Sequence, residues 1–234
     1  MGETTNKKIN LLTVPFDVFE RHKMVAVLVE KDKKVLDVGG GVDALGRFIK
    51  NKIVVSNLQS GDVLADGRSL PFADNSFEIV TSIDVIEHIS QKDRQKFVKE
   101  LIRVAGEKVI LSSPLGTKQH LGSEKKILSF LKKKGANSAY LEEHVKEVLP
   151  SEEELKKYAG GYRFQILASG DFRLSNFLTK MDVTSLKNPY FDKLFYFFKR
   201  LVNIILNIFY FPFCRSNKTG FFTNRIYLLI EKNN

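Results

Sequence analysis

The stretch that decides the fold runs Val35-Leu36-Asp37-Val38-Gly39-Gly40-Gly41-Val42-Asp43-Ala44-Leu45-Gly46. An apolar strand pattern ends there in three glycines, and an amphipathic segment with Leu45, Phe48 and Ile49 follows at once. Glycine tolerates a positive φ and lacks a Cβ, so the backbone can turn tightly and approach a ligand closely. A helix after such a turn directs free N–H groups into the crevice at the carboxyl end of the strand. The stretch therefore predicts a nucleotide-type cofactor site or a plain strand-to-helix turn, and later residues must decide.

Apolar runs alternate with helical patterns through the first half of the chain. Strands are predicted at 34–38, 52–56, 77–82 and 108–112, and helices at 16–30 and 92–104. Strands that are apolar throughout and alternate with helices indicate a mostly parallel sheet covered on both faces. The predicted fold class is therefore α/β.

The second half of the chain has a different sequence pattern, in which helices predominate. Helices are predicted at 123–134, at 140–149 and from Pro150 onward, and strands at 162–168 and 224–231. We expect a flexible tail at 1–14 and a single domain at 15–234. Within that domain we expect a helical substrate-side insertion at 116–160 and an aromatic, basic helical insertion at 182–222 before the last strand.

Composition excludes some classes of protein and leaves others open. The 234 residues are 43% hydrophobic and 27% charged, which is typical of a globular chain. The single cysteine, Cys214, excludes an intramolecular disulfide framework and a cysteine-rich zinc site. No signal peptide is apparent, so a cytoplasmic location is expected. The net charge of +10 fits attraction to nucleic acid or anionic lipid, and equally a solvated, lysine-rich face.

The segment at 190–213 is strongly aromatic and aliphatic. It is long enough to cross a bilayer, but it is interrupted by Asp192, Lys193, Lys199, Arg200, Asn203 and Asn207. A central Lys-Arg pair is expensive in hydrocarbon. The alternatives are an interfacial helix on an anionic membrane surface, a lid over the substrate pocket or dimer surface, and a true membrane span.

A longer constellation follows the glycine turn. Asn57 occupies the place after the second strand where dinucleotide folds carry an acid that binds ribose hydroxyls. The chain then continues with Gly61-Asp62-Val63-Leu64-Ala65-Asp66-Gly67-Arg68-Ser69-Leu70-Pro71-Phe72, Asp74-Asn75-Ser76-Phe77-Glu78-Ile79-Val80 and Ser82-Ile83-Asp84-Val85-Ile86-Glu87-His88-Ile89. In this order and spacing, from Val35 to Pro114, the chain resembles the class I S-adenosylmethionine-dependent methyltransferases, in their type 11-like branch.

The resemblance implies a fold and a set of cofactor contacts. The fold is a Rossmann-like, doubly wound sheet of seven strands, mostly parallel with an antiparallel last strand, and the cofactor is S-adenosylmethionine. The cofactor-binding residues that it implies are Asp37, Gly39, Gly40, Gly41, Asn57, Asp66, Gly67, Leu70, Ile83 and Asp84. Asp66 matches the acid that accepts from the adenine amino group, and Leu70 is expected to pack nearby. Ile83 and Asp84 are expected to border the methionine moiety and the transferring methyl.

Candidates for proton transfer are fewer. His88 and Asp84 are the candidate catalytic residues, although a histidine at this place can be structural and Asp84 can simply begin a helix. His144 is expected to be solvated or to contact a partner. The spacing of the histidines suggests no metal site.

The predicted activity is methyl transfer from S-adenosylmethionine to a small-molecule, sugar or lipid-linked acceptor by in-line displacement. Alignment of the nucleophile and the methyl group supplies much of the acceleration, and a base is needed only for an acceptor that must lose a proton. The acceptor pocket is expected from 116–158 and 190–213. Other possible partners are an anionic membrane surface contacting 190–213, which would put the protein at the inner face of a membrane, and a second copy in a homodimer.

Two other functions compete with this one. A degenerate methyltransferase serving as a binding or membrane-adaptor subunit is suggested by Asn57 and by the basic, aromatic segment. Nucleic acid as the substrate is disfavoured, because the sequence has no Asn-Pro-Pro-aromatic motif for an exocyclic amine.

Overall fold

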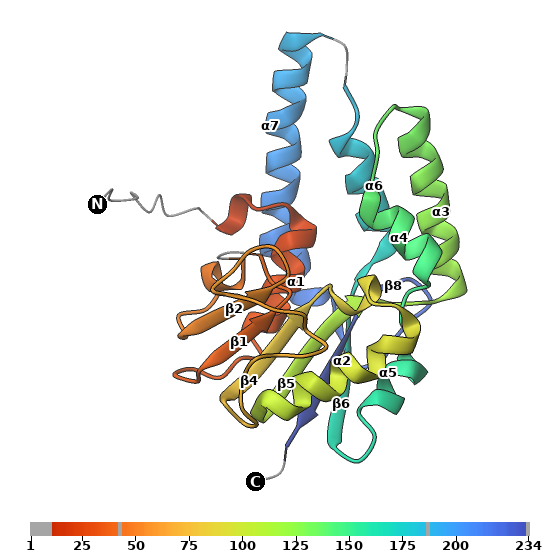
Figure 1. Ribbon diagram of the computed structural model, residues 1–234. Coiled ribbons are helices and arrows are strands. Elements are labelled where there is room, and N and C mark those ends of the chain that lie inside the picture. Colours follow the sequence, from red (N-terminus) through yellow and green to blue (C-terminus); the bar gives the residue numbers. More distant parts are fainter. Residues whose placement is uncertain (1–10, 42–43, 186–187, 233–234) are drawn as a thin grey trace.

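A mixed sheet carries the fold in the computed structural model, which describes residues 11–41, 44–185 and 188–232 (Figure 1). Over these residues the sheet has eight strands in the order β3-β2-β1-β4-β5-β8-β6-β7. Their bounds are β1 Val35–Val38, β2 Ile53–Asn57, β3 Val63–Leu64, β4 Phe77–Ile83, β5 Ala105–Pro114, β6 Arg163–Asp171, β7 Arg215–Ser216 and β8 Thr223–Glu231. Strands β1 to β5 pair in parallel, and β8 is antiparallel to both β5 and β6. The α/β prediction with an antiparallel last strand is confirmed, and the two-residue β7 is an addition to the seven strands expected.

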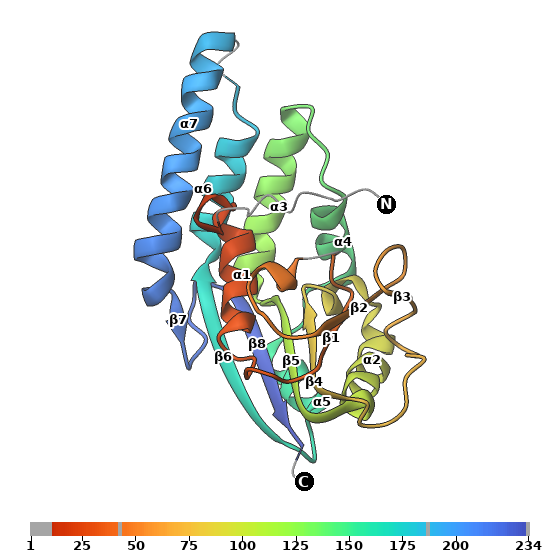
Figure 2. The same cartoon turned by 90° about the vertical axis from the view of Figure 1, so that its left-hand side faces the viewer.

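Helices cover both faces of the sheet. The helices are α1 Phe16–Ala26, α2 Gln91–Val104, α3 Lys118–Lys133, α4 Ala139–Glu147, α5 Glu152–Tyr158, α6 Phe172–Asp182 and α7 Pro189–Ile205. On one face, Phe97 and Leu101 of α2 pack in a buried cluster with Leu36 of β1. On the other, α1 contributes Phe19 and Met24 to a second buried cluster. The sheet is therefore doubly wound, with α1 and α2 on opposite sides (Figure 2).

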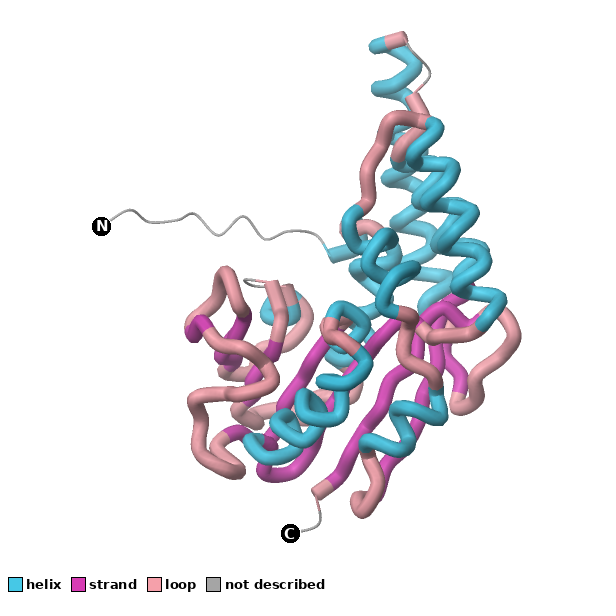
Figure 3. Tube along the Cα trace, turned by 45° about the vertical axis from the view of Figure 1, so that its right-hand side comes forward, coloured by secondary structure: helices cyan, strands magenta, loops and turns pink. Residues whose placement is uncertain are grey.

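Strand register sets where the polar residues gather. Asp37 of β1 lies opposite Val55 of β2 and Thr81 of β4, so the three parallel strands end at nearly the same level. Residues just beyond those ends therefore meet at one edge of the sheet, which is where open α/β sheets bind ligands. Most of the long helices that follow β5 lie beyond this end of the strands (Figure 3).

The connections in the first half differ from the sequence prediction. The amphipathic segment after the glycine turn forms only a 3₁₀ turn, η2 (Leu45–Arg47), and Val42 and Asp43 of the quoted run lie outside the described residues. The chain has to return to β2 at Ile53, so the segment is too short for a full crossover helix. Phe48 instead packs against Phe19 of α1, which covers this part of the sheet.

The bounds of the predicted tail and of the predicted insertion also differ from the structure. Leu11–Thr13 forms a 3₁₀ turn, η1, and Val14 is buried, so residues 11–14 belong to the domain, while residues 1–10 lie outside the described part. Helix α6 starts at Phe172, before the insertion predicted at 182–222, and was not anticipated. Beyond α7 the chain continues through one turn of π-helix, η4 (Leu206–Tyr210), and a 3₁₀ turn, η5 (Phe211–Phe213).

Helix α7 and the turn η4 that follows it attach to the body by polar side chains. Asn203 Oδ1 accepts a hydrogen bond from the backbone N–H of Phe16, and Asn207 Nδ2 donates to the carbonyls of Leu12 and Val14. Lys199 Nζ donates to the carbonyl of Met181 at the end of α6. These bonds satisfy backbone groups at helix ends, which otherwise lack partners. The apolar face of the helix is left pointing outward.

Candidate functional site

The glycine turn after β1 is locked by backbone geometry. Gly39 has a φ of +80°, and a Cβ at this position would lie 2.3 Å from Cγ2 of Val85. A Cβ on Gly40 would lie 2.0 Å from Oδ2 of Asp37, so the buried carboxylate of Asp37 needs the glycine above it. Burial raises the pKa of Asp37 to about 6, against the hydrogen bond from Thr81 that lowers it. The turn therefore presents bare backbone to the crevice.

Asn57 supports this turn from the end of β2. Its Nδ2 donates to the carbonyls of Gly39 and Gly40 at 3.1 and 3.0 Å, and its Oδ1 accepts from the backbone N–H of Gln59. A carboxylate at this position could not donate either of the first two bonds. The replacement of the expected acid by Asn57 thus has a structural reason that sequence reasoning missed.

A cavity of about 340 Å³ lies beside the turn, at the ends of β1, β2 and β4. Asn57, Asp66 and Gly67 line it, together with Phe97 from α2. A Cβ on Gly67 would lie 2.5 Å from the Phe97 ring, so only glycine fits between the cavity and the core. This bare backbone, flanked by side chains that accept and donate hydrogen bonds, fits an adenosine-type group. Leu70 is instead buried in the core cluster and does not line this cavity.

Asp66 is already engaged by a cation. Its carboxylate accepts hydrogen bonds from Nε and Nη2 of Arg68 at 3.0 and 2.6 Å. Nη1 of Arg68 donates a further hydrogen bond to Asp93. Hydrogen bonding to Arg68 lowers the pKa of Asp66, which therefore stays ionised. A carboxylate has about four lone-pair sites, and the backbone N–H, Nε–H and Nη2–H of Arg68 occupy three of those on Asp66, which leaves one to accept from an amino group.

A second cavity, of about 790 Å³, opens between the sheet edge and the helices above it. It is lined by residues of α1, α3, α4 and α6, including Arg21, His120, Glu124, His144 and Thr179. Residues from the range 116–158, where part of the acceptor pocket is predicted, contribute to its lining. The segment 190–213 contributes none of the lining residues in the described part of the chain, and α6 takes the place that the prediction gave it.

The two cavities share Gly39, Asp84 and His88. Ile83, at the end of β4, lines the larger one. The sequence-predicted site residues at the ends of β1 and β4 are thus brought together at the junction of the cavities.

Asp84 is held as a permanent anion. Its carboxylate accepts Nε and Nη2 of Arg225 at 2.9 and 2.6 Å, and Arg21 Nη1 lies 3.2 Å away. Burial by itself raises the pKa of Asp84, but the guanidinium groups of Arg225 and Arg21 overcome it and lower the pKa to about 2. A base with so low a pKa is a poor proton acceptor at neutral pH, so the geometry does not favour Asp84 as the catalytic base.

Arg225 lies in β8, and nothing in the sequence of the last strand marks it as a residue of the site. It also lies 3.6 Å from Glu20 of α1, whose carboxylate is hydrogen bonded to Ser169 of β6. The network links α1, β4, β6 and β8 beneath the junction of the cavities. No local motif marks it, because its members are spread from residue 20 to residue 225.

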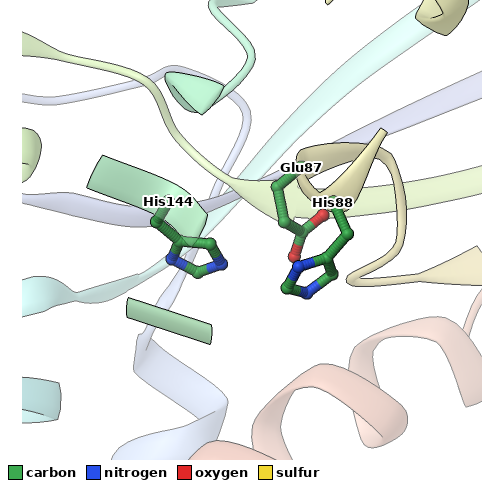
Figure 4. Close-up of side chains that lie close together, drawn as sticks. All are labelled: Glu87, His88 and His144. Atoms are coloured by element: carbon green, nitrogen blue, oxygen red, sulfur yellow. The ribbon is translucent and has the colours of Figure 1, made fainter. Parts of the chain in front are cut away.

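His88 lies beside two residues that sequence spacing does not connect with it. It belongs to a 3₁₀ turn, η3 (Ile86–His88), after β4, and its Nδ1 is 2.6 Å from Oε2 of Glu143 on α4. The ring of His144 lies 5.4 Å from the ring of His88, centroid to centroid. Figure 4 shows the side chains of Glu87, His88 and His144 facing one another across this space. The side chain of His144 is buried, with 5% of the residue exposed, so it is not the solvated residue that the sequence predicts.

Comparisons with known proteins agree with the fold and the motifs. The sequence profile of the family described as "Methyltransferase domain" matches residues 36–111. Tocopherol O-methyltransferase, chloroplastic, of Arabidopsis thaliana is 34% identical over 99 residues, which cover 32% of this chain and 28% of the relative. The aligned segment thus spans less than a third of that curated relative.

Solved structures show the same fold over most of the chain. An S-adenosylmethionine-dependent methyltransferase of Thermotoga maritima, described as a possible histamine N-methyltransferase, superimposes with a TM-score of 0.56 at 14% identity, covering 95% of this chain and 92% of that one. Phosphoethanolamine N-methyltransferase 2 of Haemonchus contortus, in complex with S-adenosyl-L-methionine, gives a TM-score of 0.53 at 16% identity, covering 91% of this chain and 52% of that one. At these identities the likeness concerns the fold alone. Together with the family match, it confirms the resemblance to class I S-adenosylmethionine-dependent methyltransferases.

Proposed function

We propose that this protein transfers a methyl group from S-adenosylmethionine to a small-molecule, sugar or lipid-linked acceptor. The observation that carries the proposal is the junction of two cavities at Gly39, Asp84 and His88. The smaller cavity has the bare backbone and the polar groups that suit the cofactor. The larger one opens at the place where an acceptor has to meet the methyl group.

The residues at the junction mainly orient the cofactor and the acceptor and shield them from water. Bound S-adenosylmethionine supplies a methyl group on a good leaving group, so the protein contributes alignment and exclusion of water. The Gly39 turn and Asn57 fix the backbone under the cofactor, and Asp66 accepts from its adenine amino group. His88 borders both cavities and is placed to accept a proton if the acceptor is a hydroxyl.

Transfer of a labelled methyl group tests the proposal. The full chain is incubated with methyl-labelled S-adenosylmethionine and fractionated small molecules, and labelled products are detected by mass spectrometry. Gly39→Ala should abolish the labelling, because its Cβ would collide with Val85 at a φ of +80°. Gly122→Ala is the matched control, since nothing lies within 4 Å of its Cβ. If binding of the cofactor is normal but no fraction yields a labelled product, the transferase proposal fails.

One of the two observations that suggested a degenerate methyltransferase has another explanation. That observation is the uncharged Asn57, which instead holds the glycine turn by two hydrogen bonds. The other observation, the basic aromatic segment, is compatible with an active enzyme. We therefore favour the enzyme.

We further propose that α7 binds an anionic membrane surface, which would place the enzyme at the cytoplasmic face of a membrane. Pro189–Phe213 has the length and the apolar composition of a membrane-spanning helix, and little of its apolar stretch is buried in the body of the protein. Exposed aromatic side chains include Phe197, Phe198 and Phe209, between 51% and 66% exposed. The exposed cations Lys193 and Arg200 on the same helix, with the net charge of +10, favour anionic headgroups over a second copy of this chain.

Liposome flotation tests the membrane proposal. The full chain should float with vesicles of phosphatidylglycerol and phosphatidylcholine, and less with phosphatidylcholine alone. Combined replacement of Phe197, Phe198 and Phe209 by serine should abolish flotation. Phe177→Ser, at a 55% exposed position on α6, is the control and should leave it unchanged. Equal flotation of wild type and triple variant, or a concentration-dependent dimer without flotation, would contradict the proposal.

A further inference from the structure

Three potential ligand atoms meet at the wall of the larger cavity. Glu87, His88 and His144 each offer one nitrogen or oxygen atom, and these atoms lie within 4.8 Å of one another. Glu87 and His88 come from η3, and His144 comes from α4 (Figure 4). All three residues line the 790 Å³ cavity.

The carboxylate of Glu87 has an unused oxygen. Its side chain is 1% exposed, and Oε2 has no hydrogen-bond partner. A buried polar atom without a partner is costly, and native proteins almost always satisfy such atoms with protein groups, water or an ion. This orphaned oxygen is on one of the three residues of the group and is the observation that points to a ligand there.

Both histidines are held by further carboxylates. Glu124 Oε1 lies 2.9 Å from Nδ1 of His144, and Glu143 Oε2 lies 2.6 Å from Nδ1 of His88. Histidines that bind metals commonly have a carboxylate on one ring nitrogen, which fixes the ring and increases the basicity of the other nitrogen. For His144 this leaves Nε2 directed toward Glu87 and His88 (Figure 4).

Further carboxylates lie beside the two histidines, those of Glu124 and Glu143. The guanidinium groups of Arg21 and Arg225 are bound to Asp84. Burial and the nearby Asp84 raise the pKa of Glu87 well above its ordinary value, which favours the protonated acid, so a bound divalent ion would take the place of that proton.

We propose that Glu87, His88 and His144 form a binding site for a divalent transition metal of the zinc and iron(II) class. Two imidazoles and one carboxylate are a ligand set for such ions, and they leave coordination positions open. The open positions would face the cavity, where an acceptor oxygen could bind and be made more acidic by the metal. His88 would then act as a ligand, in place of the role of proton acceptor.

Metal binding is measured on the full chain, stripped with a chelator and carrying no polyhistidine tag. We expect one equivalent of Zn²⁺ by calorimetry, and visible absorption of four- or five-coordinate Co²⁺ on titration with that ion. His88→Gln should weaken Zn²⁺ binding strongly while leaving the fold intact, because the His88 side chain is 35% exposed. Glu124→Gln should weaken it about 10- to 100-fold through the orientation of His144.

His22→Gln is the matched control. His22 also lines the cavity, but its Nδ1 is bonded to the carbonyl of Val18 and its ring stacks on Phe48. Circular dichroism confirms that each variant is folded. Absence of stoichiometric Zn²⁺ binding, or equal binding by wild type and His88→Gln, would overturn the proposal. Binding of S-adenosylhomocysteine by the metal-free chain is measured separately, so failure of the metal site is distinguished from failure of the methyltransferase proposal.

Discussion

At the scale of single residues, Asn57 differs most from what the sequence indicated. The motif places it where an acid binds ribose, but its amide hydrogens point back to the carbonyls of Gly39 and Gly40. The direction of backbone carbonyls in a turn is not visible in a sequence, so this role could not be predicted. Asp37, Gly39, Asp66 and Gly67, in contrast, line the cavities at the strand ends, because a local motif fixes them relative to one another; their contacts with a cofactor stay a prediction.

Asn57→Asp should therefore weaken cofactor binding. The variant loses two donated hydrogen bonds and directs a carboxylate at two carbonyl oxygens, at a cost of about 1–3 kcal/mol. Calorimetric titration with S-adenosylhomocysteine should show an affinity reduced by roughly tenfold or more. A gain in affinity would mean that Asn57 is a weakened ribose ligand after all.

Asp37 gives a pH-dependent prediction. Its pKa is raised by burial from 3.8 to about 6, so the native state holds a proton that the unfolded chain loses earlier. The stability associated with this proton is present below about pH 4 and is lost as the pH rises through 6.

Asp37→Asn should remove the decrease in stability that wild type shows as the pH rises through 6. Relative to wild type, the variant should gain up to about 3 kcal/mol in the free energy of unfolding above pH 6, and the gain should shrink toward zero below pH 4. Thermal unfolding of both apoproteins from pH 4 to pH 8 measures the difference. A difference that does not depend on pH would contradict the raised pKa.

At the scale of elements, the sheet was largely predictable and α7 was not. Apolar runs revealed β1, β2, β4, β5, β6 and β8, because the strands of a covered sheet are rich in apolar residues. The amphipathic pattern of 190–213 indicates a polar and an apolar face, but it does not indicate which face packs against the rest of the protein. The asparagines turned out to attach the helix to residues about 190 positions away, which no local pattern can reveal.

Asn207→Ala should loosen α7. The carbonyls of Leu12 and Val14 lose their donor, which should cost about 1–3 kcal/mol. Amide exchange should become faster in α7 and at the start of α1. Asn51→Ala is the control, since it removes two similar hydrogen bonds, to Glu30 and Lys33, away from α7. Unchanged exchange in α7 would show that these bonds do not hold the helix.

At the scale of the whole molecule, the buried network around Arg225 joins both halves of the chain. It pairs a residue of the last strand with Asp84 of the motif and Glu20 of α1. The cofactor half was predictable from one continuous motif. The acceptor half, including the group formed by Glu87, His88 and His144, was not, because His144 lies on a helix far along the chain.

Arg225→Met should destabilise the whole domain. Removing one partner leaves Asp84 and Glu20 buried without their main counter-ion, which typically costs about 3–5 kcal/mol. The melting temperature should fall by roughly 2–4 °C for each kcal/mol. Arg163→Met, which breaks an exposed pair with Glu231, should change it very little. Similar small shifts for both variants would contradict a structural role for the network.

Binding of the cofactor tests the central claim most directly. Isothermal titration of the full chain with S-adenosylmethionine should show one site, and Gly67→Ala should abolish it, because the added Cβ would lie 2.5 Å from Phe97. Gly122→Ala, whose Cβ meets nothing within 4 Å, should bind like wild type. No binding by the folded wild-type chain, or equal binding by Gly67→Ala, would contradict the account.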